Sequence, residues 1–196
     1  MDNRAQGPAY GTISLIRHGQ SSCTSQPWID GRQYKEWLSA YDDRSILSGQ
    51  IPLEESLESV RTGDFLYTSH LARAIDSAAL LGPGKSFTQE ALFREAAIPA
   101  PFIFKGLKLS TNLWNACMRL CWLLGYSGDI EPYRAAKKRA EQSALQLMEA
   151  ASRGNIVLVG HGFFNHMIGK ELRKHGWHTA RRQRSVHWAC TTYRLV

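Results

Sequence analysis

The sequence has few cysteines, and their spacing argues against a disulfide framework. Only four cysteines occur in 196 residues, and none of them forms a Cys-x-x-Cys pair. A chain of this length can bury enough apolar surface to fold without disulfides. Cys117 and Cys121, four residues apart on a helical pattern, are expected to be small buried hydrophobic residues. The cysteines therefore indicate a reducing compartment.

Long apolar runs are also missing. No run approaches the roughly 20 residues that a membrane-spanning helix needs. Arg119 interrupts the most apolar long segment, "WNACMRLCWLLGY". The N-terminal "MDNRAQGPAYG" lacks the apolar core of a secretory signal. We therefore expect a cytoplasmic protein without a membrane-spanning segment.

Basic residues outnumber acidic ones, which favours anionic partners. The chain has 24 Lys and Arg against 17 Asp and Glu, a formal net charge of +7. Many basic residues cluster late, in "KELRKHGWHTARRQRS". Only Trp177 and Trp188 lie near this cluster, and single-stranded nucleic acids are usually bound by interleaved stacking aromatics. A solvated basic surface is thus favoured over a nucleic-acid site.

Apolar strand patterns alternate with helical patterns along the chain. Strands are predicted near 12–17, 64–69, 155–160 and 185–196, and helices near 33–41, 52–61, 70–81, 111–126, 132–153 and 163–175. Pro52 is expected at the first position of its helix and Ser69 as the cap of the next. Residues 87–105 look irregular. This alternation predicts an α/β fold with a mostly parallel sheet, in a single domain 1–196 with a helical insert near 107–153.

Two of the predicted strands end in the same dipeptide. "ISLIRHGQS" contains Arg17, His18 and Gly19, and "NIVLVGHG" ends in His161 and Gly162. Ligands of open α/β sheets bind beyond the carboxyl ends of the strands, so both histidines are expected at one edge. Arg73, in "SHLARA" after a third strand, can point to the same edge. Two imidazoles and two guanidiniums suit a phosphoryl group, because imidazole attacks phosphorus and arginines bind its oxygens.

A phosphoryl transfer also needs an acid for the leaving alcohol. Glu95, in the irregular "LFREAAIP", is the candidate, and Glu90 is the alternative. A zinc site on His161, His166 and His18 is disfavoured, because helical zinc pairs lie four apart rather than five. No metal is therefore expected. The remaining late histidines are expected to be surface or core residues: His166, His175, His178 and His187.

Four motifs, in order, resemble those of the histidine phosphatase superfamily, which has the phosphoglycerate mutase-like fold. They are "LIRHGQS", "TSHLARAIDSA", "LFREA" and "VLVGHG". The resemblance implies a three-layer sandwich with a mostly parallel central sheet flanked by helices. The roles that it implies are the nucleophile, the second histidine, the proton donor, two phosphate-binding arginines and a substrate-binding hydroxyl: His18, His161, Glu95, Arg17, Arg73 and Ser21.

The resemblance implies a histidine acid phosphatase-type phosphomonoesterase that needs no cofactor. Its substrate would be a small-molecule phosphate ester or a phosphorylated protein. A phosphoglycerate mutase-like transfer and a non-catalytic phosphate-binding module remain as alternatives. A homo-oligomer is left open. The segment "AAIPAPF" after Glu95 departs from the family's usual continuation, which keeps Glu90 as the alternative acid.

Overall fold

The computed structural model describes residues 10–101 and 106–196, which fold around a six-stranded sheet. The strand order is β3-β2-β4-β1-β6-β5. The first four strands of this order pair in parallel, and β6 and β5 add antiparallel pairs at one side. The strands are β1 (Ile13–Arg17), β2 (Phe65–Thr68), β3 (Thr88–Gln89), β4 (Ile156–Gly160), β5 (Trp177–His178) and β6 (Cys190–Leu195). The predicted mostly parallel sheet is confirmed.

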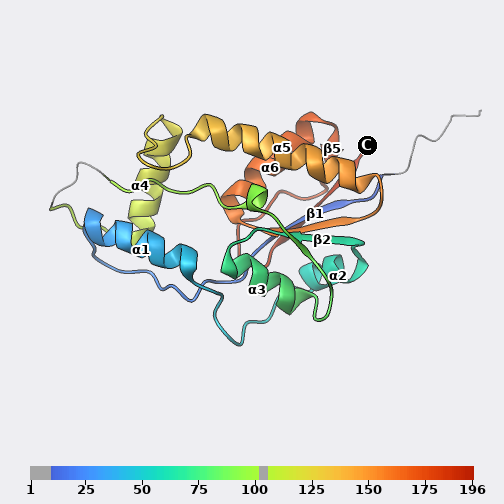
Figure 1. Ribbon diagram of the computed structural model, residues 1–196, viewed down its shortest axis with the longest axis horizontal. Helices are drawn as coiled ribbons and strands as arrows, with labels where there is room; N and C mark the ends of the chain where they lie inside the picture. Colours follow the sequence, from blue (N-terminus) through green and yellow to red (C-terminus); the bar gives the residue numbers. More distant parts are fainter. Residues whose placement is uncertain (1–9, 102–105) are drawn as a thin grey trace, which may run out of the picture.

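Helices cover both faces of this sheet, as the three-layer prediction requires. α5 (Tyr133–Ala151) and α6 (Gly162–Lys174) lie on one face, and α2 (Glu54–Thr62) and α3 (Ala72–Leu81) on the other (Figure 1). Side chains alternate along each central strand. In β4, Ile156 and Leu158 belong to the core under α5 and α6, whereas Val157 and Val159 belong to the core under α2 and α3. These strands are buried on both faces, which explains their nearly continuous apolar sequence.

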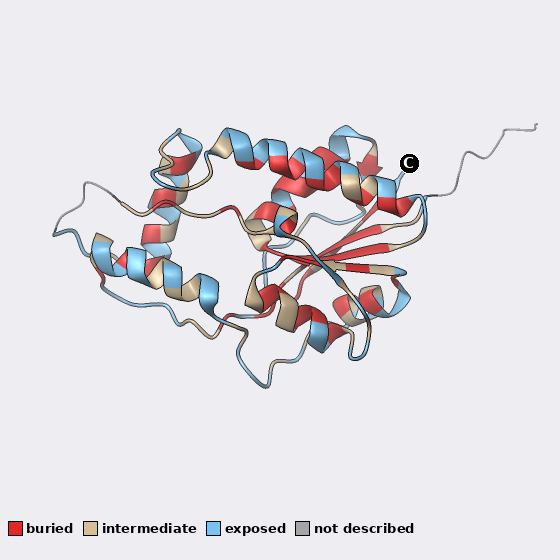
Figure 2. Cartoon of the chain, viewed as in Figure 1, coloured by how far each residue is buried: buried red, intermediate tan, exposed pale blue. Residues whose placement is uncertain are grey.

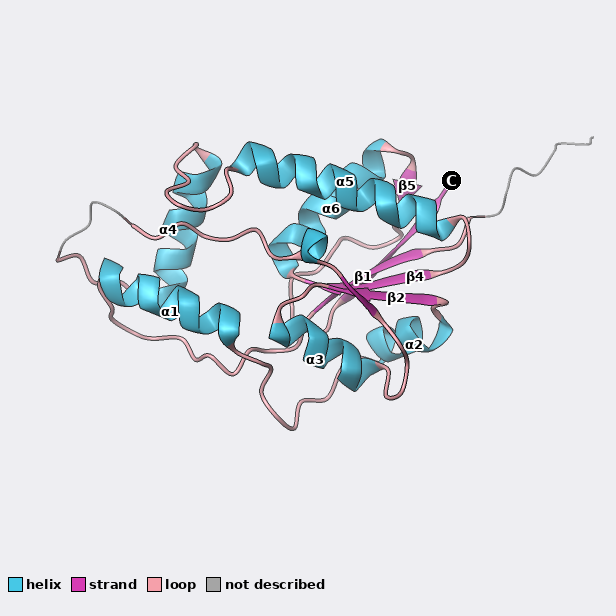
Figure 3. Ribbon diagram, viewed as in Figure 1, coloured by secondary structure: helices cyan, strands magenta, loops and turns pink. Residues whose placement is uncertain are grey.

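Two further helices lie beyond the sheet. α1 (Gly31–Asp43) and α4 (Thr111–Leu123) lie to the left of the sheet in the view of Figure 3. They share a separate small core that includes Tyr34, Trp114 and Met118 (Figure 2). The hydroxyl of Tyr34 donates to Asn115 Oδ1 at 2.7 Å, which ties the two helices together. α4 and α5 together span most of the segment predicted as an insert.

Two helix starts differ from the sequence prediction. α2 begins at Glu54 with Leu53 as its N-cap, so Pro52 precedes the helix instead of opening it. α3 has Leu71 as its N-cap, and no side chain caps it. The Ser69 hydroxyl accepts from the Leu71 amide at 3.2 Å. The same hydroxyl also bonds to His161, 92 residues away, so it serves a tertiary contact as well as the start of the helix.

Other local predictions also need correction. Cys117 is exposed, and Cys121 is only half-buried at the margin of the core that α1 and α4 share, because Trp114, Met118 and Trp122 are the α4 side chains that are fully buried. The segment 87–105, predicted as irregular, contains β3 and the short helix η1 (Ala91–Phe93), and its residues 102–105 lie outside the described part. β5 was not predicted, and the last strand begins only at Cys190.

Residues 1–9, on which the prediction about a secretory signal depends, are also outside the described part. Within residues 10–101 and 106–196, no helix combines the length and the apolar character required to cross a bilayer.

Candidate active site

Parallel pairing of β1 with β4 brings His18 and His161 together. Arg17 and Gly160 are the last partners in this register, so the next residue of each strand leaves the sheet at the same edge. The two imidazole centroids are 5.1 Å apart. Both side chains are almost fully buried, with 2% and 0% exposed. Residues 143 positions apart therefore form one pair at the carboxyl edge of the sheet.

The tautomer of His18 follows from its backbone contact. Its Nδ1 lies 2.6 Å from the carbonyl oxygen of Gly19. A carbonyl only accepts hydrogen bonds, so Nδ1 carries the proton and Nε2 keeps a free lone pair. Burial, and secondarily the charge of Arg73, hold the pKa of His18 well below 6.5. His18 is thus a neutral imidazole at neutral pH, which is the form that a nucleophile requires.

Gly19 allows an aromatic ring to close over this turn. A Cβ at Gly19 would lie 2.2 Å from Cζ2 of Trp188, so only glycine fits under the indole. Trp188 itself has φ of 63°, a left-handed conformation that is costly for a bulky residue. Its amide donates to the carbonyl of Arg17 at 3.0 Å. The ring and the backbone together fix the turn that holds His18.

His161 is positioned by a hydroxyl. Its Nε2 lies 2.6 Å from Ser69 Oγ, at the end of β2. Its Nδ1 is buried and has no hydrogen-bond partner among the described residues. Burial, followed by the neighbouring His18, lowers the pKa of His161 well below 6.5.

Arg17 and Arg73 place two guanidiniums beside the histidine pair. Arg17 donates through Nη1 to the carbonyl of Ser185. Its Nε packs closely against Gly162, where an added Cβ would lie only 3.1 Å from it. Arg73 is 1% exposed and donates to the carbonyl of Tyr41 at 3.2 Å. The Nε atoms of both arginines are buried without a hydrogen-bond partner among the described residues.

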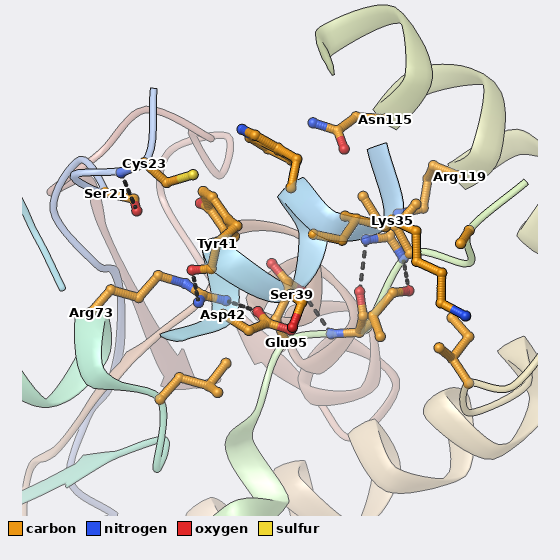
Figure 4. Close-up of a pocket in the computed structure, with 18 of the residues that line it drawn as sticks. Ser21, Cys23, Lys35, Ser39, Tyr41, Asp42, Arg73, Glu95, Asn115 and Arg119 are labelled. Carbon is orange, nitrogen blue, oxygen red and sulfur yellow. Dashed lines mark hydrogen bonds and ion pairs between the residues drawn. The ribbon is translucent and has the colours of Figure 1, made fainter. Parts of the chain in front are cut away.

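The end of α1 holds the Arg73 guanidinium from two more directions. The Cζ atom of Arg73 lies 4.6 Å from the centroid of the Tyr41 ring, which is a cation–π contact. Its Nη2 donates to Asp42 Oδ1 at 3.1 Å, forming an ion pair (Figure 4). This arginine is therefore fixed by a helix that lies outside the sheet layers.

Glu95 lies in the same cavity, between η1 and α6. Its Oε1 accepts from the amides of Ala96 at 2.8 Å and Phe164 at 3.0 Å, whereas Oε2 has only a 3.4 Å contact with the Phe163 amide. Oε2 is thus the less engaged oxygen. Glu90, the alternative acid, accepts from Gln146 Nε2 at 2.7 Å and is not among the residues that line this cavity.

Ser21 also lines the cavity, but its hydroxyl serves the local backbone. The side chain is 5% exposed, and Oγ accepts from the amide of Cys23 at 3.2 Å. Ser21 therefore lies at the cavity wall, and its hydroxyl stabilises the turn to Cys23.

His187 is a site residue that sequence reasoning missed, as are Ser69 beside His161 and Asp42 beside Arg73. The ring centroid of His187 lies 5.5 Å from that of His18, and its Nδ1 lies 3.1 Å from the His18 carbonyl oxygen. It was predicted to be an ordinary surface or core residue, and this prediction is wrong. It comes before β6, whose antiparallel pairing with β1 brings it to the strand end. The signal in the sequence was its place just before the last apolar strand.

A cavity of about 1020 Å³ opens over these groups. One end contains Arg17, Arg73 and His187, and the other lies between α1 and α4. Figure 4 shows Asn115 and Arg119 of α4 at this end of the cavity, with Lys35 of α1 beside Arg119 and Tyr41 closer to Arg73. Arg119 donates to the carbonyls of Ala96 and Ala97 and so braces the segment that carries Glu95. The helical segment beyond the sheet thus forms much of the cavity wall.

The site contains groups that suit phosphoryl transfer: imidazoles, guanidiniums and a carboxyl group. Within the described residues, no three His, Cys, Asp or Glu side chains are placed to bind one ion. His166 is exposed on α6, so the triad considered for zinc does not assemble. The arrangement offers a neutral imidazole, buried cationic donors and the carboxyl group of Glu95, whose Oε2 is the less engaged oxygen.

Solved structures of several phosphate-handling enzymes share this fold. A phosphoglycerate mutase from Bacillus anthracis aligns with a TM-score of 0.59 at 17% identity, covering 94% of this chain and 88% of the mutase. A phosphoserine phosphatase from Entamoeba histolytica, solved with phosphoserine, gives 0.58 at 18%, covering 93% and 89%. A mycobacterial glucosyl-3-phosphoglycerate phosphatase gives 0.54 at 18%, covering 84% and 80%. These likenesses show the phosphoglycerate mutase-like fold.

Sequence comparison shows the family. No curated protein sequence matches the chain significantly. A family model described as the histidine phosphatase superfamily (branch 1) matches residues 51–195, which is more than half of the chain. The chain therefore belongs to the histidine phosphatase superfamily.

Proposed function

We propose that this protein is a phosphatase that hydrolyses a phosphomonoester through a phosphohistidine on His18. One observation carries the proposal. Among the described residues, four buried side-chain polar atoms lack a hydrogen-bond partner, and three of them are nitrogens of this site: Arg17 Nε, Arg73 Nε and His161 Nδ1. Buried polar groups are normally satisfied. A tetrahedral anion beside His18 would accept from all three.

In the first step, Nε2 of His18 attacks phosphorus while the bond to the leaving oxygen breaks. The Gly19 carbonyl holds the Nδ1 proton, so the lone pair of Nε2 is directed to the reaction. Arg17 and Arg73 stabilise the charge on the phosphoryl oxygens. Glu95, protonated at this stage, gives its Oε2 proton to the leaving alcohol.

His161 contributes a neutral donor to the same anion. The Ser69 hydroxyl accepts from the Leu71 amide and can give its own proton to Nε2 of His161. The ring proton then lies on Nδ1, the nitrogen that has no protein partner. This tautomer suits an oxygen of the phosphoryl group.

In the second step, water attacks the phosphohistidine, and the Glu95 carboxylate, deprotonated in the first step, acts as the base that takes the water proton. The phosphorus–nitrogen bond breaks, its electrons return to Nε2 of His18, and phosphate leaves. This step distinguishes a phosphatase from a mutase, which returns the phosphoryl group to its product. The open cavity of about 1020 Å³ gives water access to the site, which favours hydrolysis.

The substrate would be a small-molecule phosphate ester or a phosphorylated protein, as for a histidine acid phosphatase-type phosphomonoesterase. We propose that the insert 107–153 selects it, because Asn112, Asn115 and Arg119 of α4 line the far end of the cavity. The solved relatives include enzymes named for phosphoserine and for glucosyl-3-phosphoglycerate. These names supply the first compounds to assay.

The test is a panel of phosphorylated metabolites, phosphopeptides and an aryl phosphate, with released phosphate as the readout. Labelled substrate should also leave acid-labile, base-stable label on the wild-type protein and none on His18→Ala. Transfer of label to a second metabolite with little free phosphate would establish the mutase instead. Binding of phosphate esters without any label on His18 would establish the non-catalytic module.

A further inference from the structure

The proposed proton donor, Glu95, lies on an irregular segment of the chain. It follows the short helix η1, and residues 94–101 belong to no helix or strand. The backbone carbonyls of such a segment need hydrogen-bond partners from elsewhere, because no regular ladder supplies them. For the carbonyls on both sides of Glu95, these partners are arginine side chains of α4 and α5, the helices of the insert.

On the N-terminal side of Glu95, the partner is Arg139 of α5. Its side chain is buried. Its Nη1 donates to the carbonyls of Leu92 at 2.9 Å and Arg94 at 2.8 Å. Its Nε and Nη2 donate to the carboxylate of Glu131, with Nη2 2.8 Å from Oε2. One planar group therefore ties two carbonyls of the segment to α5 and completes an ion pair.

The face of the same guanidinium packs on a residue that binds the Glu95 carboxylate. The Cζ atom of Arg139 lies 3.8 Å from the centroid of the Phe164 ring. The amide of Phe164 donates to Glu95 Oε1 at 3.0 Å. Arg139 thus contacts both the backbone that precedes Glu95 and the residue whose amide holds its carboxylate.

Arg119 of α4 repeats this arrangement on the C-terminal side of Glu95. It donates to the carbonyls of Ala96 at 2.7 Å and Ala97 at 3.1 Å (Figure 4). Its Cζ atom lies 4.3 Å from the centroid of the Phe163 ring, and the Phe163 amide lies 3.4 Å from Glu95 Oε2. Each arginine therefore binds two carbonyls beside Glu95 and stacks on an aromatic residue in the first turn of α6.

From this geometry we infer that Arg139 is a positioning residue for Glu95. Together with Arg119, it holds the segment against the start of α6, so that Oε1 stays bound to amides and Oε2 stays available for proton transfer. The inference rests on the proposed function, in which Glu95 gives a proton to the leaving oxygen and later takes one from water. Arg139 is not among the residues that line the cavity, so it acts on the reaction through Glu95.

The chemistry of the position requires a guanidinium. A guanidinium has five N–H donors in one plane, so it can bind two carbonyls and a carboxylate while its face stacks on a ring. A lysine at position 139 would keep the positive charge beside Glu131, but its compact ammonium group has no flat face and cannot span the same acceptors. Arg139→Lys therefore keeps the ion pair and loosens the segment that carries Glu95.

Single-turnover kinetics of Arg139→Lys test the inference. Phosphorylation of His18 by alkyl phosphates should slow roughly 10- to 100-fold, because a small displacement of the acid costs this much. Phosphorylation by p-nitrophenyl phosphate should slow less than about 3-fold, since its leaving group needs no proton. Dephosphorylation should slow for every substrate, because Glu95 is its base. The inhibition constant for inorganic phosphate should stay at the wild-type value, because Arg17 and Arg73 bind that anion.

Two control variants separate the positioning role from the ion pair and from the charge of α5. Glu131→Gln removes the carboxylate and leaves both carbonyl bonds of Arg139. It should lower the unfolding temperature without any preference between alkyl and aryl phosphates. Arg134→Lys, exposed on the same helix, should behave as wild type. A leaving-group preference in Glu131→Gln equal to that in Arg139→Lys would assign the effect to the ion pair and overturn the inference.

A double-mutant cycle with Glu95→Gln supplies a readout that a general structural defect would not produce. In the Glu95→Gln background, Arg139→Lys should change the alkyl phosphate rate less than about 3-fold, because the group through which it acts is gone. Equal factors in both backgrounds would overturn the inference, as would equal slowing of alkyl and aryl phosphates. Absence of phosphohistidine in the wild-type protein would instead overturn the proposed function itself.

A second variant keeps the test decisive if lysine is not tolerated at position 139. Arg139→Gln combined with Glu131→Gln removes both charges of the ion pair, so neither partner is left as an unpaired charge. This double variant should show the same selective slowing of alkyl phosphates, and a single common factor for all substrates would contradict the inference. Circular dichroism and the unfolding temperature verify that each variant folds.

Discussion

Asp42 accepts a hydrogen bond from the buried guanidinium of Arg73, with 3.1 Å between Oδ1 and Nη2. One partner is 1% exposed and the other 55% exposed, so the carboxylate reaches in from the surface to the proposed phosphate site. A phosphate ester that binds Arg73 must share this cation with Asp42. The end of α1 thus weakens anion binding at the very group that would bind the phosphate.

We therefore expect Asp42→Asn to tighten phosphate binding. Removal of the carboxylate leaves Arg73 with neutral partners, the Tyr41 carbonyl and ring. The inhibition constant for inorganic phosphate should fall about 3- to 10-fold, corresponding to about 1 kcal/mol for a half-exposed charge. The measurement is competitive inhibition at low and high salt. Asp43→Asn, exposed on the same turn, is the control and should change the constant little. Weaker binding in Asp42→Asn would mean that the carboxylate positions the arginine rather than competing for it.

Glu95→Gln should separate substrates by their leaving groups. Without the acid, esters of alkyl alcohols should lose about 100- to 1000-fold in kcat, because their alkoxide needs a proton as it departs. p-Nitrophenyl phosphate should lose far less, since its leaving group is stable as an anion. Kinetics over a series of aryl and alkyl phosphates measure this difference.

Glu90→Gln is the matched control for that series, because Glu90 lies outside the cavity and pairs with Gln146. Equal slowing of good and poor leaving groups in Glu95→Gln would show that the carboxylate only caps α6. Selective slowing in Glu90→Gln would assign the acid to the alternative residue.

Ser69→Ala should lower activity without changing the fold. The variant removes the hydroxyl 2.6 Å from His161 Nε2 and leaves the tautomer of that ring unfixed. We expect kcat to fall roughly 5- to 10-fold, as loss of about 1 kcal/mol in the transition state would produce. Steady-state kinetics measure the effect, with Ser152→Ala as the control, because the Ser152 hydroxyl donates to the Glu149 carbonyl at the end of its own helix, α5. An unchanged kcat would show that His161 needs no partner at Nε2.

Acid should destabilise the protein partly through the histidine pair. The pKa of His18 is lowered by burial, so the folded state keeps it neutral while the unfolded chain binds a proton below about pH 6.5. Unfolding therefore becomes easier as the pH falls through this range, and the slope from one such group approaches about 1.4 kcal/mol per pH unit. His18→Gln should show a shallower decline between pH 6.5 and 5 in denaturant titrations. Parallel declines in both proteins would mean that carboxylates alone cause the acid sensitivity.

Much of the fold could be predicted because its strands are short and apolar. β1 and β4 are buried on both faces, so burial leaves a continuous hydrophobic signature that ends where the chain meets solvent. The residues immediately after such strands are the natural site residues of an α/β sheet, which is why Arg17, His18 and His161 stand out in the sequence. The starts of α2 and α3 were less predictable. Pro52 precedes α2 instead of opening it, and Ser69 bonds to the distant His161 instead of capping α3.

Other parts of the site depend on contacts that no local pattern encodes. Asp42 and Arg73 are 31 residues apart, and the loop with His187 is 169 residues from His18. The first contact needs α1 to fold back beyond the sheet, and the second needs β6 to pair antiparallel with β1. In the local sequence, neither Asp42 nor His187 can be told apart from an ordinary surface residue.

The amino-acid order by itself determined the layered α/β architecture and the identity of the two strand-end histidines, because burial and backbone hydrogen bonding act over a few neighbouring residues. Only the tertiary structure decided which nitrogen of each imidazole carries the proton, which carboxylate faces Arg73, and that a third histidine enters the site. These outcomes depend on strand register and on the packing of distant side chains, and hydrogen-bond geometry changes with shifts of less than an ångström.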